Sequence, residues 1–297
     1  FKTSLNISHN PGRFSHFLTA DYTTSDGYIR NTDFSGSNLF YQAGYHPKKG
    51  TIDFQAGYHT RDFGANSFYS LRYPDQFEAV STSYVSLKYQ SNTRIQFIPA
   101  VYLRRNKDRF ELIRNNTSVP SNHHLTTVTG FNLNLRTTGR LGKTSFGLDF
   151  RNEHILSNLL GNERAIPVKV PGFDSAFYTK SYNRLNNGLY AEHSATLNRF
   201  SVNAGFMLHH NNDLKGYGIY PGVDLSYLLK NHLTLYSAVN KTLRMPTFTD
   251  LFYESPVQQG DPALKPEKAI TAEGGLRYRN SVWNGHLSAF RRQSYDM

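Results

Sequence analysis

The sequence predicts an all-β protein, a transmembrane antiparallel β-barrel with about fourteen strands present. Three observations predict this class: residues alternate between apolar and polar, connections alternate between short and long, and the composition is thin for a soluble core. Hydrophobic residues, counted with Tyr and without Gly, make up 38% of the chain. Counted instead with the 22 Gly and without the 20 Tyr, the share is about 39%, against roughly 45–50% in soluble domains. No apolar run approaches the roughly 18 residues of a membrane helix, so helical membrane proteins are excluded.

The alternation has a period of two residues, as expected for strands with one apolar and one polar face. After Thr51, the side chains of Ile52, Phe54, Ala56 and Tyr58 form the first clear apolar face. Many such segments approach the roughly 9–11 residues of a tilted membrane strand. The other apolar faces are Phe14, His16, Leu18, Ala20 and Tyr22; Ile95, Phe97, Pro99, Val101 and Leu103; Thr144, Phe146, Leu148 and Phe150; Val202, Ala204, Phe206 and Leu208; Ile219, Val223, Leu225, Tyr227 and Leu229; and Ile270, Ala272, Leu276 and Tyr278.

The connections alternate in length along the whole chain. The short turns are Asn10–Gly12, Pro47–Gly50, Ser91–Thr93, Thr138–Gly139, Asn198–Arg199, Lys230–His232 and Asn280–Ser281. The long connections are expected near Ser25–Thr32, Thr60–Gln76, Arg105–His124, Leu156–Asn186, Asn211–Gly216 and Leu243–Lys268. This alternation is typical of outer-membrane barrels, with short periplasmic turns and long extracellular loops. A soluble sandwich or propeller is the alternative, but its strands are shorter and its loops need not alternate.

Charge and motif content narrow the function. The chain has no Cys, which removes disulfides, Cys-ligated zinc and thiol nucleophiles. The 33 Lys+Arg against 22 Asp+Glu give a net charge of +11, which suits nucleic acid, lipid phosphates or acidic ligands. The basic residues are dispersed among strands, without a zinc finger or RNP pattern, so nucleic acid is not expected as a partner. No enzyme signature is present, and we expect no enzymatic activity.

A segment near the end of the chain has a distinctive pattern of proline and charged residues. It consists of Arg244 and Pro246, then Asp261, Pro262, Leu264, Pro266 and Glu267, followed by Glu273 and Gly275. This segment resembles the barrel of TonB-dependent outer-membrane receptors, in which a strand ends in Arg-x-Pro and an Asn-Pro-x-Leu-x-Pro-Glu element opens the next strand. Asp261 stands here in place of the usual Asn.

The physics of the segment agrees with this resemblance. Pro262 and Pro266 cannot donate to a β-ladder, so the strand is expected to begin at Glu267. The period of two then puts Glu273 on the polar face that lines the lumen. We interpret these matching residues as structural, with Glu267 and Glu273 satisfying loop amides or lumen Arg side chains.

The resemblance implies an architecture and a transport function. Family members have 22 strands and an N-terminal plug that a TonB-type energy-coupling protein engages. Residues 1–297 are therefore interpreted as a partial barrel domain without the plug and the C-terminal strands. The expected function is uptake of a scarce large nutrient across the bacterial outer membrane, with no cofactor.

The substrate is less sharply indicated. Arg61–Ser70, Tyr73–Glu78 and Arg104–Leu112 loosely resemble cobalamin-receptor-like members. This favours a corrinoid, with a siderophore or haem receptor of the same family as the alternative. A passive porin or a loop-based adhesin would share every barrel feature, and a soluble β-rich binding protein is the third class.

Two regions are candidate ligand sites. The loop Thr60–Gln76 mixes aromatic and amide side chains suited to a large, partly apolar ligand, and packing within the rim is the alternative. A basic run is predicted at the extracellular end of a strand, suited to an anionic ligand or to lipopolysaccharide phosphates, with a solvated rim as the alternative. The predicted ligand residues are Phe63, Asn66, Tyr69, Tyr73, Gln76, Arg104 and Arg105, and Lys107, Arg109 and Arg114 continue the basic run.

No metal site is expected. The pairs His123-His124 and His209-His210 are adjacent residues, whose side chains point to opposite faces of a strand. Cobalamin receptors use loop carboxylates with Ca²⁺. The available loop carboxylates are too scattered for a calcium loop: Asp26, Asp33, Asp62 and Asp75.

Overall fold

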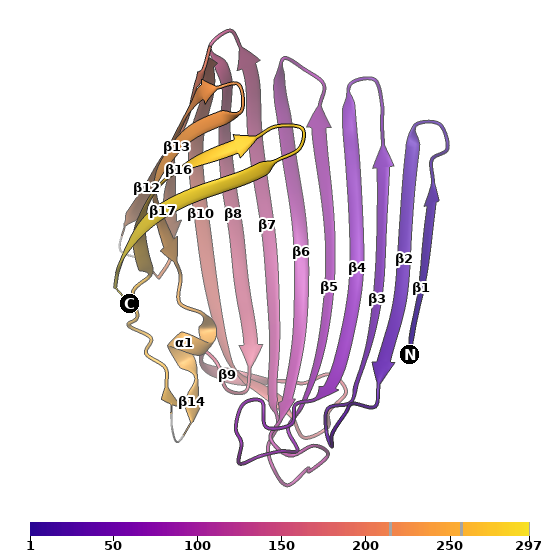
Figure 1. Ribbon diagram of the computed structural model, residues 1–297. Helices are drawn as coiled ribbons and strands as arrows, with labels where there is room; N and C mark the ends of the chain where they lie inside the picture. Colours follow the sequence, from indigo (N-terminus) through magenta and orange to yellow (C-terminus); the bar gives the residue numbers. More distant parts are fainter. Residues whose placement is uncertain (214–215, 256–257, 297) are drawn as a thin grey trace.

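The computed structural model describes residues 1–213, 216–255 and 258–296. Fourteen strands follow one another in a single antiparallel sheet, and β9 pairs with β10 beside this path (Figure 1). The strands are β1 (Lys2–His9), β2 (Phe14–Ser25), β3 (Phe34–Tyr45), β4 (Gly50–Gly64), β5 (Phe77–Ser91), β6 (Ile95–Glu111), β7 (Asn122–Gly139), β8 (Gly142–Ser157), β9 (Asn162–Lys169), β10 (Phe177–Leu197), β11 (Phe200–Asn211), β12 (Tyr217–Lys230), β13 (Leu233–Arg244), β16 (Glu267–Arg279) and β17 (Asn284–Tyr295). The connection between β13 and β16 carries helix α1 (Phe248–Phe252) and the short pair β14 (Glu254–Ser255) and β15 (Gln258–Gln259).

The predicted alternation of connections is confirmed. Short turns at 10–13, 46–49, 92–94, 140–141, 198–199, 231–232 and 280–283 form one rim, at the top of Figure 1. The longer connections at 26–33, 65–76, 112–121, 158–176, 212–216 and 245–266 form the other rim. Two expected loops, Asn211–Gly216 and Leu243–Lys268, each include two residues outside the described part of the chain.

One face of the sheet is apolar and continuous across neighbouring strands. Leu148 lies at the centre of a row in which every member pairs with the next, and its side chain is 48% exposed. The row consists of Pro99, Leu133, Leu148, Leu189, Leu208 and Ile219. A continuous exposed apolar band is the surface that a membrane β-barrel turns toward lipid. The apolar faces expected for these strands are therefore confirmed.

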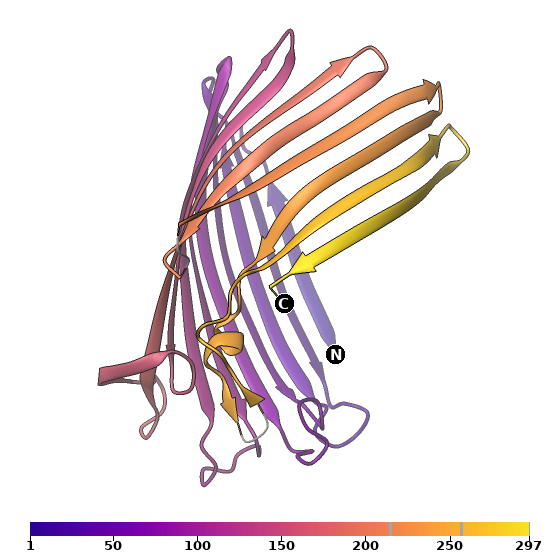
Figure 2. The same cartoon turned by 90° about the vertical axis from the view of Figure 1, so that its left-hand side faces the viewer.

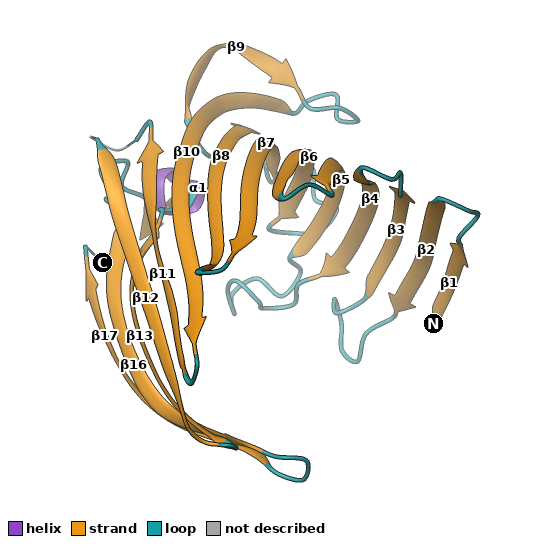
Figure 3. Ribbon diagram, turned by 90° about the horizontal axis from the view of Figure 1, so that it is seen from above, coloured by secondary structure: helices purple, strands orange, loops and turns teal. Residues whose placement is uncertain are grey.

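The sheet curves into an open arc, with β1 and β17 at its two edges (Figure 3). Helix α1 lies on the concave side of the wall, whereas β9 projects from the convex side (Figure 2). A small apolar core of Leu125, Val170 and Tyr178 fixes the β9 connection to the wall. Among the described residues, no helix is long and apolar enough to cross a membrane.

Tyrosines on the polar face pack over glycines of the neighbouring strand. In each pair the Tyr and Gly are direct cross-strand partners, and a Cβ on the glycine would clash with the ring. A strand glycine therefore marks a place where a neighbouring group approaches closely. The pairs are Tyr84 with Gly57, Tyr102 with Gly130, Tyr190 with Gly147, and Tyr236 with Gly275.

Several strands are longer than the sequence indicated. β4 continues to Gly64, β6 continues to Glu111, and β10 already begins at Phe177, inside segments expected to be loops. The expected loops at Thr60–Gln76, Arg105–His124 and Leu156–Asn186 are therefore shorter, and the last contains β9. The reason is that the ladder of backbone hydrogen bonds continues beyond the apolar band, where both faces become polar and the period of two fades.

Candidate functional site

The basic run on β6 is divided by the alternation of the strand. Arg104 lies on the concave, polar face, where it lines a pocket with Arg151 and Arg184. Arg105 and Lys107 lie on the opposite face, because neighbouring residues of a strand point to opposite sides. The loop was expected to begin at Arg105, which is wrong: β6 continues to Glu111, so Arg105, Lys107 and Arg109 are strand residues and Arg114 lies in the connection that follows. Arg104 and Arg105 therefore do not share a site.

A pocket of about 330 Å³ lies between the concave face and the connection from β13 to β16. Strands β6, β7, β8 and β10 supply one wall, and the segment just before and at the start of α1 supplies the other. The volume is at the lower end of the range for small-molecule sites. The lining residues are Arg104, Thr126, Val128, Arg151, Glu153, Arg184, Asn186, Met245, Pro246, Thr247 and Phe248.

Arg184 is the centre of the charged network beside this pocket. Its side chain is only 5% exposed, and its Nε donates to Asp213 Oδ2 at 3.0 Å. Its Nη1 lies 3.8 Å from Glu153 Oε2, and the ring of Phe248 packs 4.9 Å from its guanidinium. Tyr182 donates its hydroxyl to the other oxygen of Asp213 at 2.6 Å. Two carboxylates and an aromatic ring thus hold the buried guanidinium in one orientation.

Three buried donors on the pocket wall have no hydrogen-bond acceptor in the described structure: Arg184 Nη2, Asn186 Nδ2 and Arg151 Nε. Arg151 Nε lies 2.9 Å from Glu153 Oε1, so charge attraction is present there without a well-aligned hydrogen bond. Buried donors without partners are costly, so this surface favours a group rich in acceptor oxygens. The arrangement suits an anionic group better than a cationic one.

The family segment positions the inner wall of this pocket. Pro246 is buried directly after β13, and α1 then begins with Thr247 as its N-cap. Asp250 N–H donates to Thr247 Oγ1 at 3.1 Å, and Thr247 N–H donates back to the Asp250 carboxylate at 2.8 Å. Donation from the Thr247 backbone holds the pKa of Asp250 below its usual range. This capping box fixes the start of α1 against the concave face.

Glu267 has an arginine partner, as expected, whereas the partner of Glu273 is a tyrosine rather than an arginine or a loop amide. Glu267 is the first residue of β16, as expected, and accepts from Arg244 at 2.7 Å. Glu273 accepts from the Tyr236 hydroxyl at 3.1 Å on the polar face. Pro266 is buried before β16, whereas Pro262 and Leu264 are exposed in the connection.

The aromatic loop packs onto the concave ends of β5 and β6. Tyr69 donates its hydroxyl to Glu78 at 2.6 Å, and its ring meets the edge of Phe110 at 5.2 Å. Burial, with the Glu78 bond second, raises the pKa of the Tyr69 hydroxyl. The ring is still 57% exposed. Tyr69 is therefore oriented by the wall while about half of its surface stays exposed.

The side chains of the two predicted amide residues, Gln76 and Asn66, form hydrogen bonds with backbone groups of the loops. Gln76 is 1% exposed, and its side-chain oxygen accepts from the Tyr69 backbone at 3.1 Å. Asn66 donates its amide to the Arg30 carbonyl at 2.7 Å, which joins two loops. Gln76 thus lies inside the loop rather than on its surface, where a ligand contact was predicted.

The remaining predicted aromatics are divided between strand and loop. Phe63 is not a loop residue, because it lies within β4, with the Arg61 guanidinium 5.5 Å from its ring. Tyr73 lies in the loop beside Arg72, at 5.8 Å. The structure therefore places Tyr69 and Tyr73 in the loop and Phe63 in the wall below it.

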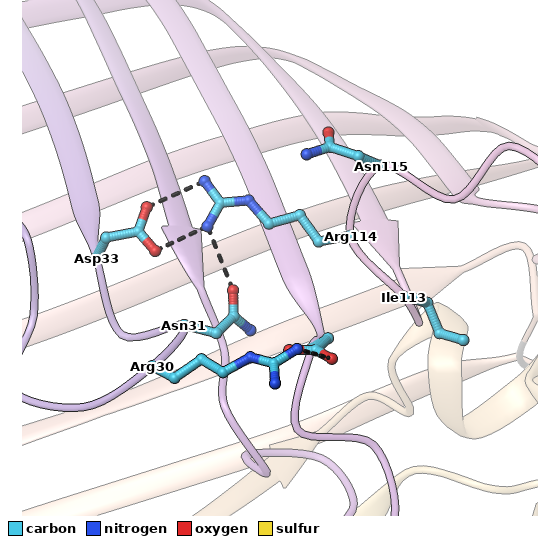
Figure 4. A pocket seen from close by; sticks show the side chains of 7 residues that line it. Arg30, Asn31, Asp33, Ile113, Arg114 and Asn115 are labelled. Carbon is cyan, nitrogen blue, oxygen red and sulfur yellow. Dashed lines mark hydrogen bonds and ion pairs between the residues drawn. The ribbon is translucent and has the colours of Figure 1, made fainter.

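Ion pairs join three neighbouring long loops around a second pocket (Figure 4). Arg114 donates to both oxygens of Asp33, at 2.7 and 3.0 Å, and to Asn31 Oδ1 at 3.2 Å. Arg30 pairs with Asp75 at 2.8 Å. The Arg114 bonds hold the pKa of Asp33 below its usual range. The cations and anions of this pocket are paired, so it serves to hold the loops together.

The histidines and loop carboxylates do not form a metal centre in the described residues, where no three His, Asp or Glu side chains gather in a suitable group. His123 bonds with Ser121, whereas His124 bonds with Ser157 on the next strand. Asp33 and Asp75 are engaged by arginines.

The sequence did not single out Glu153, Arg184, Asn186 or Asp213 as site residues. Because Phe150 belongs to the apolar face of β8, alternation puts Arg151 and then Glu153 on the polar face. That Arg184 and Asn186 lie directly opposite Glu153 and Arg151 follows only from the register of β8 with β10. The position of Asp213 at the end of β11 depends on the fold of a loop.

The long strands, the apolar outer band, the polar concave face and the inward-folded connection define the wall of an outer-membrane β-barrel receptor. The chain belongs to the TonB dependent receptor-like, beta-barrel family, whose model matches residues 2–297. Barrels of this family reside in the bacterial outer membrane, and the family consists of transporters and receptors.

Solved structures of similar fold include siderophore receptors and an iron transporter. The ferric enterobactin receptor PfeA of Pseudomonas aeruginosa, as a G324V mutant, is 13% identical with a TM-score of 0.76, over 99% of this chain and 50% of the receptor. The siderophore receptor PirA of the same organism is 13% identical with a TM-score of 0.76, over 99% and 52%. The FrpB iron transporter of Neisseria meningitidis is 12% identical with a TM-score of 0.74, over 99% and 52%. The chain thus spans about half the length of each. Among curated proteins no match is found.

Proposed function

We propose that the chain forms part of the wall of an energy-coupled receptor that imports a large anionic iron chelate. The observation that carries the proposal is the concave pocket, where Arg104, Arg151 and Arg184 meet and the buried donors Arg184 Nη2 and Asn186 Nδ2 have no hydrogen-bond acceptor in the described structure. Iron-chelating oxygens and carboxylates are acceptor-rich and anionic, which suits this surface. The pocket takes one group of such a ligand rather than the whole of it.

The exposed half of Tyr69 supplies a second contact for the same ligand. Phe110 and Arg104 are six residues apart on the same face of β6, which is roughly 20 Å along a strand. A ligand captured by the loop of Tyr69 at the rim therefore follows one face of one strand toward the pocket. In this proposal the substrate is moved across the membrane and not chemically changed.

The energy for transport comes from outside this chain. A plug and a TonB-type energy-coupling protein are the partners we propose for the whole receptor. The iron receptors of similar fold favour a siderophore over the corrinoid that the loop sequences suggested. Haem and corrinoid are the competing ligands that a binding experiment separates.

The test is a titration of the purified full-length receptor with a ferric catecholate siderophore, a ferric hydroxamate siderophore, haem and cyanocobalamin. A ferric siderophore is expected to bind, and Arg104→Gln is expected to weaken it about tenfold or more, because a charge-assisted contact is worth roughly 1.5–3 kcal/mol. Lys48→Gln, in a turn of the opposite rim, removes the same charge as a control and should leave the affinity unchanged. Binding of cyanocobalamin alone, or equal affinities of the two variants, would overturn the proposal.

A further inference from the structure

The outer face of β6 carries three basic side chains directly beyond its apolar segment. Val101 and Leu103 are exposed on this face, and Arg105, Lys107 and Arg109 follow at the same two-residue spacing. Each step of two residues advances roughly 6–7 Å along the strand. The three cations therefore rise from the edge of the lipid-facing band toward the rim with the longer loops.

The neighbours of Arg105 and Lys107 do not neutralise them. Arg105 lies between Ser83 and Thr127, and Lys107 lies between Ser81 and Leu125. In the part of the chain that the structure describes, neither Arg105 nor Lys107 has an ion-pair partner, and both are exposed. Small hydroxyl side chains beside exposed cations suit a ligand made of phosphate and sugar oxygens.

Arg109 is held more firmly than the other two. Its guanidinium lies 5.5 Å from the ring of Phe77 and 5.2 Å from the ring of Phe173. It is 3.4 Å from Glu111, which is the carboxylate on this face of the strand. Arg109 is thus fixed in place, whereas the charges of Arg105 and Lys107 face outward without a carboxylate partner.

The connection that carries β9 bounds this surface on the convex side of the wall (Figure 2). Val170, Phe173 and Tyr178 pack over Leu125, the partner of Lys107 on β7. From β9, Arg164 donates to Ser181 Oγ at 3.1 Å. Ser181 lies in the same cross-strand row as Lys107, through Leu125 and Leu156. The connection therefore places a further cation on the same outer face, three strands away from β6.

We propose that this outer surface binds the phosphorylated sugar headgroup of an outer-leaflet glycolipid, the chemistry of lipid A. The acyl chains lie against Val101 and Leu103, and the phosphates meet Arg105 and Lys107 just above them. An apolar band continuous with the cations selects a lipid over a free anion, because only a lipid satisfies both parts at once. The proposal is independent of what the receptor transports.

The test measures retention of bisphosphorylated lipid A by the full-length receptor in detergent, using native mass spectrometry over a series of lipid A concentrations. The double variant Arg105→Gln/Lys107→Gln is expected to weaken retention tenfold or more. Arg104→Gln removes a cation from the same strand on the opposite face and is expected to retain lipid A as the wild type does. Unchanged heat-resistant mobility of each variant on gels shows that the barrel is folded.

Two further probes decide what the surface recognises. Lipid A without its phosphates is expected to bind at least tenfold more weakly to the wild type, and equal binding would overturn the proposal. Inorganic phosphate is expected not to displace lipid A at equal phosphate concentration, and displacement would show a site for free anions instead. Equal retention by the double variant and by Arg104→Gln would also overturn it.

Discussion

The concave and convex faces of β6 carry the same kinds of charge but in opposite surroundings. Arg104 faces a pocket shared with Arg151, Arg184 and Glu153, whereas Arg105 faces outward between a serine and a threonine. One step along the strand therefore separates a candidate substrate contact from a candidate lipid contact. Basic residues that follow one another in a barrel strand thus lie alternately on its two faces, and those on each face must be interpreted with the neighbours on that face.

The two faces also differ in how they satisfy polar groups. On the concave face, the buried Arg184 is paired with Asp213 and Glu153, and tyrosines pack over glycines. On the convex face, the exposed apolar side chains have no polar groups that require a partner. Charged substitutions are therefore expected to have very different costs on the two faces.

The comparison of the two faces of β6 depends first on which rim of the sheet lies outside the cell. Labelling of single Cys residues at the two rims tests this and is expected to give the largest effect. A single Cys at Asn116, in a long connection, should react with a membrane-impermeant thiol reagent in intact cells expressing the full-length receptor. A single Cys at Asn231, in a short turn, should not react until the outer membrane is opened. Both positions are exposed, so accessibility within the protein does not separate them. Labelling at Asn231 alone would reverse the orientation of both faces.

Substitutions on β8 test whether a charged side chain costs more stability on the apolar face than on the polar face. Leu148→Arg should reduce the free energy of unfolding in lipid vesicles by about 2–4 kcal/mol if Leu148 lies near the bilayer midplane. Ser145→Arg, three residues away on the polar face, should change it little. Similar losses for the two variants would contradict the assignment of the apolar face to lipid.

A smaller effect tests the rim end of the concave face. Tyr69→Ala should weaken siderophore binding by roughly thirtyfold, because truncating a buried aromatic anchor commonly costs about 2 kcal/mol. Tyr58→Ala is the matched control on the convex face, where the ring is 51% exposed, and should leave affinity unchanged. Titration of both variants with one ferric siderophore is the measurement. Equal affinities would limit Tyr69 to packing on Phe110.

Much of the fold could be predicted because each face obeys a simple rule. Most turns were placed to within a residue or two because Gly, Asn and Pro end strands for local reasons, whereas the turn expected at Thr138–Gly139 lies at 140–141, because β7 continues through Gly139. The apolar face was placed correctly because a membrane barrel carries apolar residues at every second position. Strand ends at the outer rim were misplaced, since beyond the membrane neither face must be apolar. The site was predicted in part: Tyr69 and Arg104 lie on the concave face, whereas Gln76 is buried and Arg105 points outward.

By itself, the sequence determined the alternation of each strand, the order of short and long connections, and the structural role of Pro266 before Glu267. These features are local, because they depend on one residue and its near neighbours in the chain. Only the tertiary structure decided that Glu153 meets Arg184, that α1 folds against β10, and that β9 lies on the convex side. Such contacts depend on the register between strands and on the path of long loops. Both are set by packing between residues far apart in sequence, which no single segment of the chain specifies.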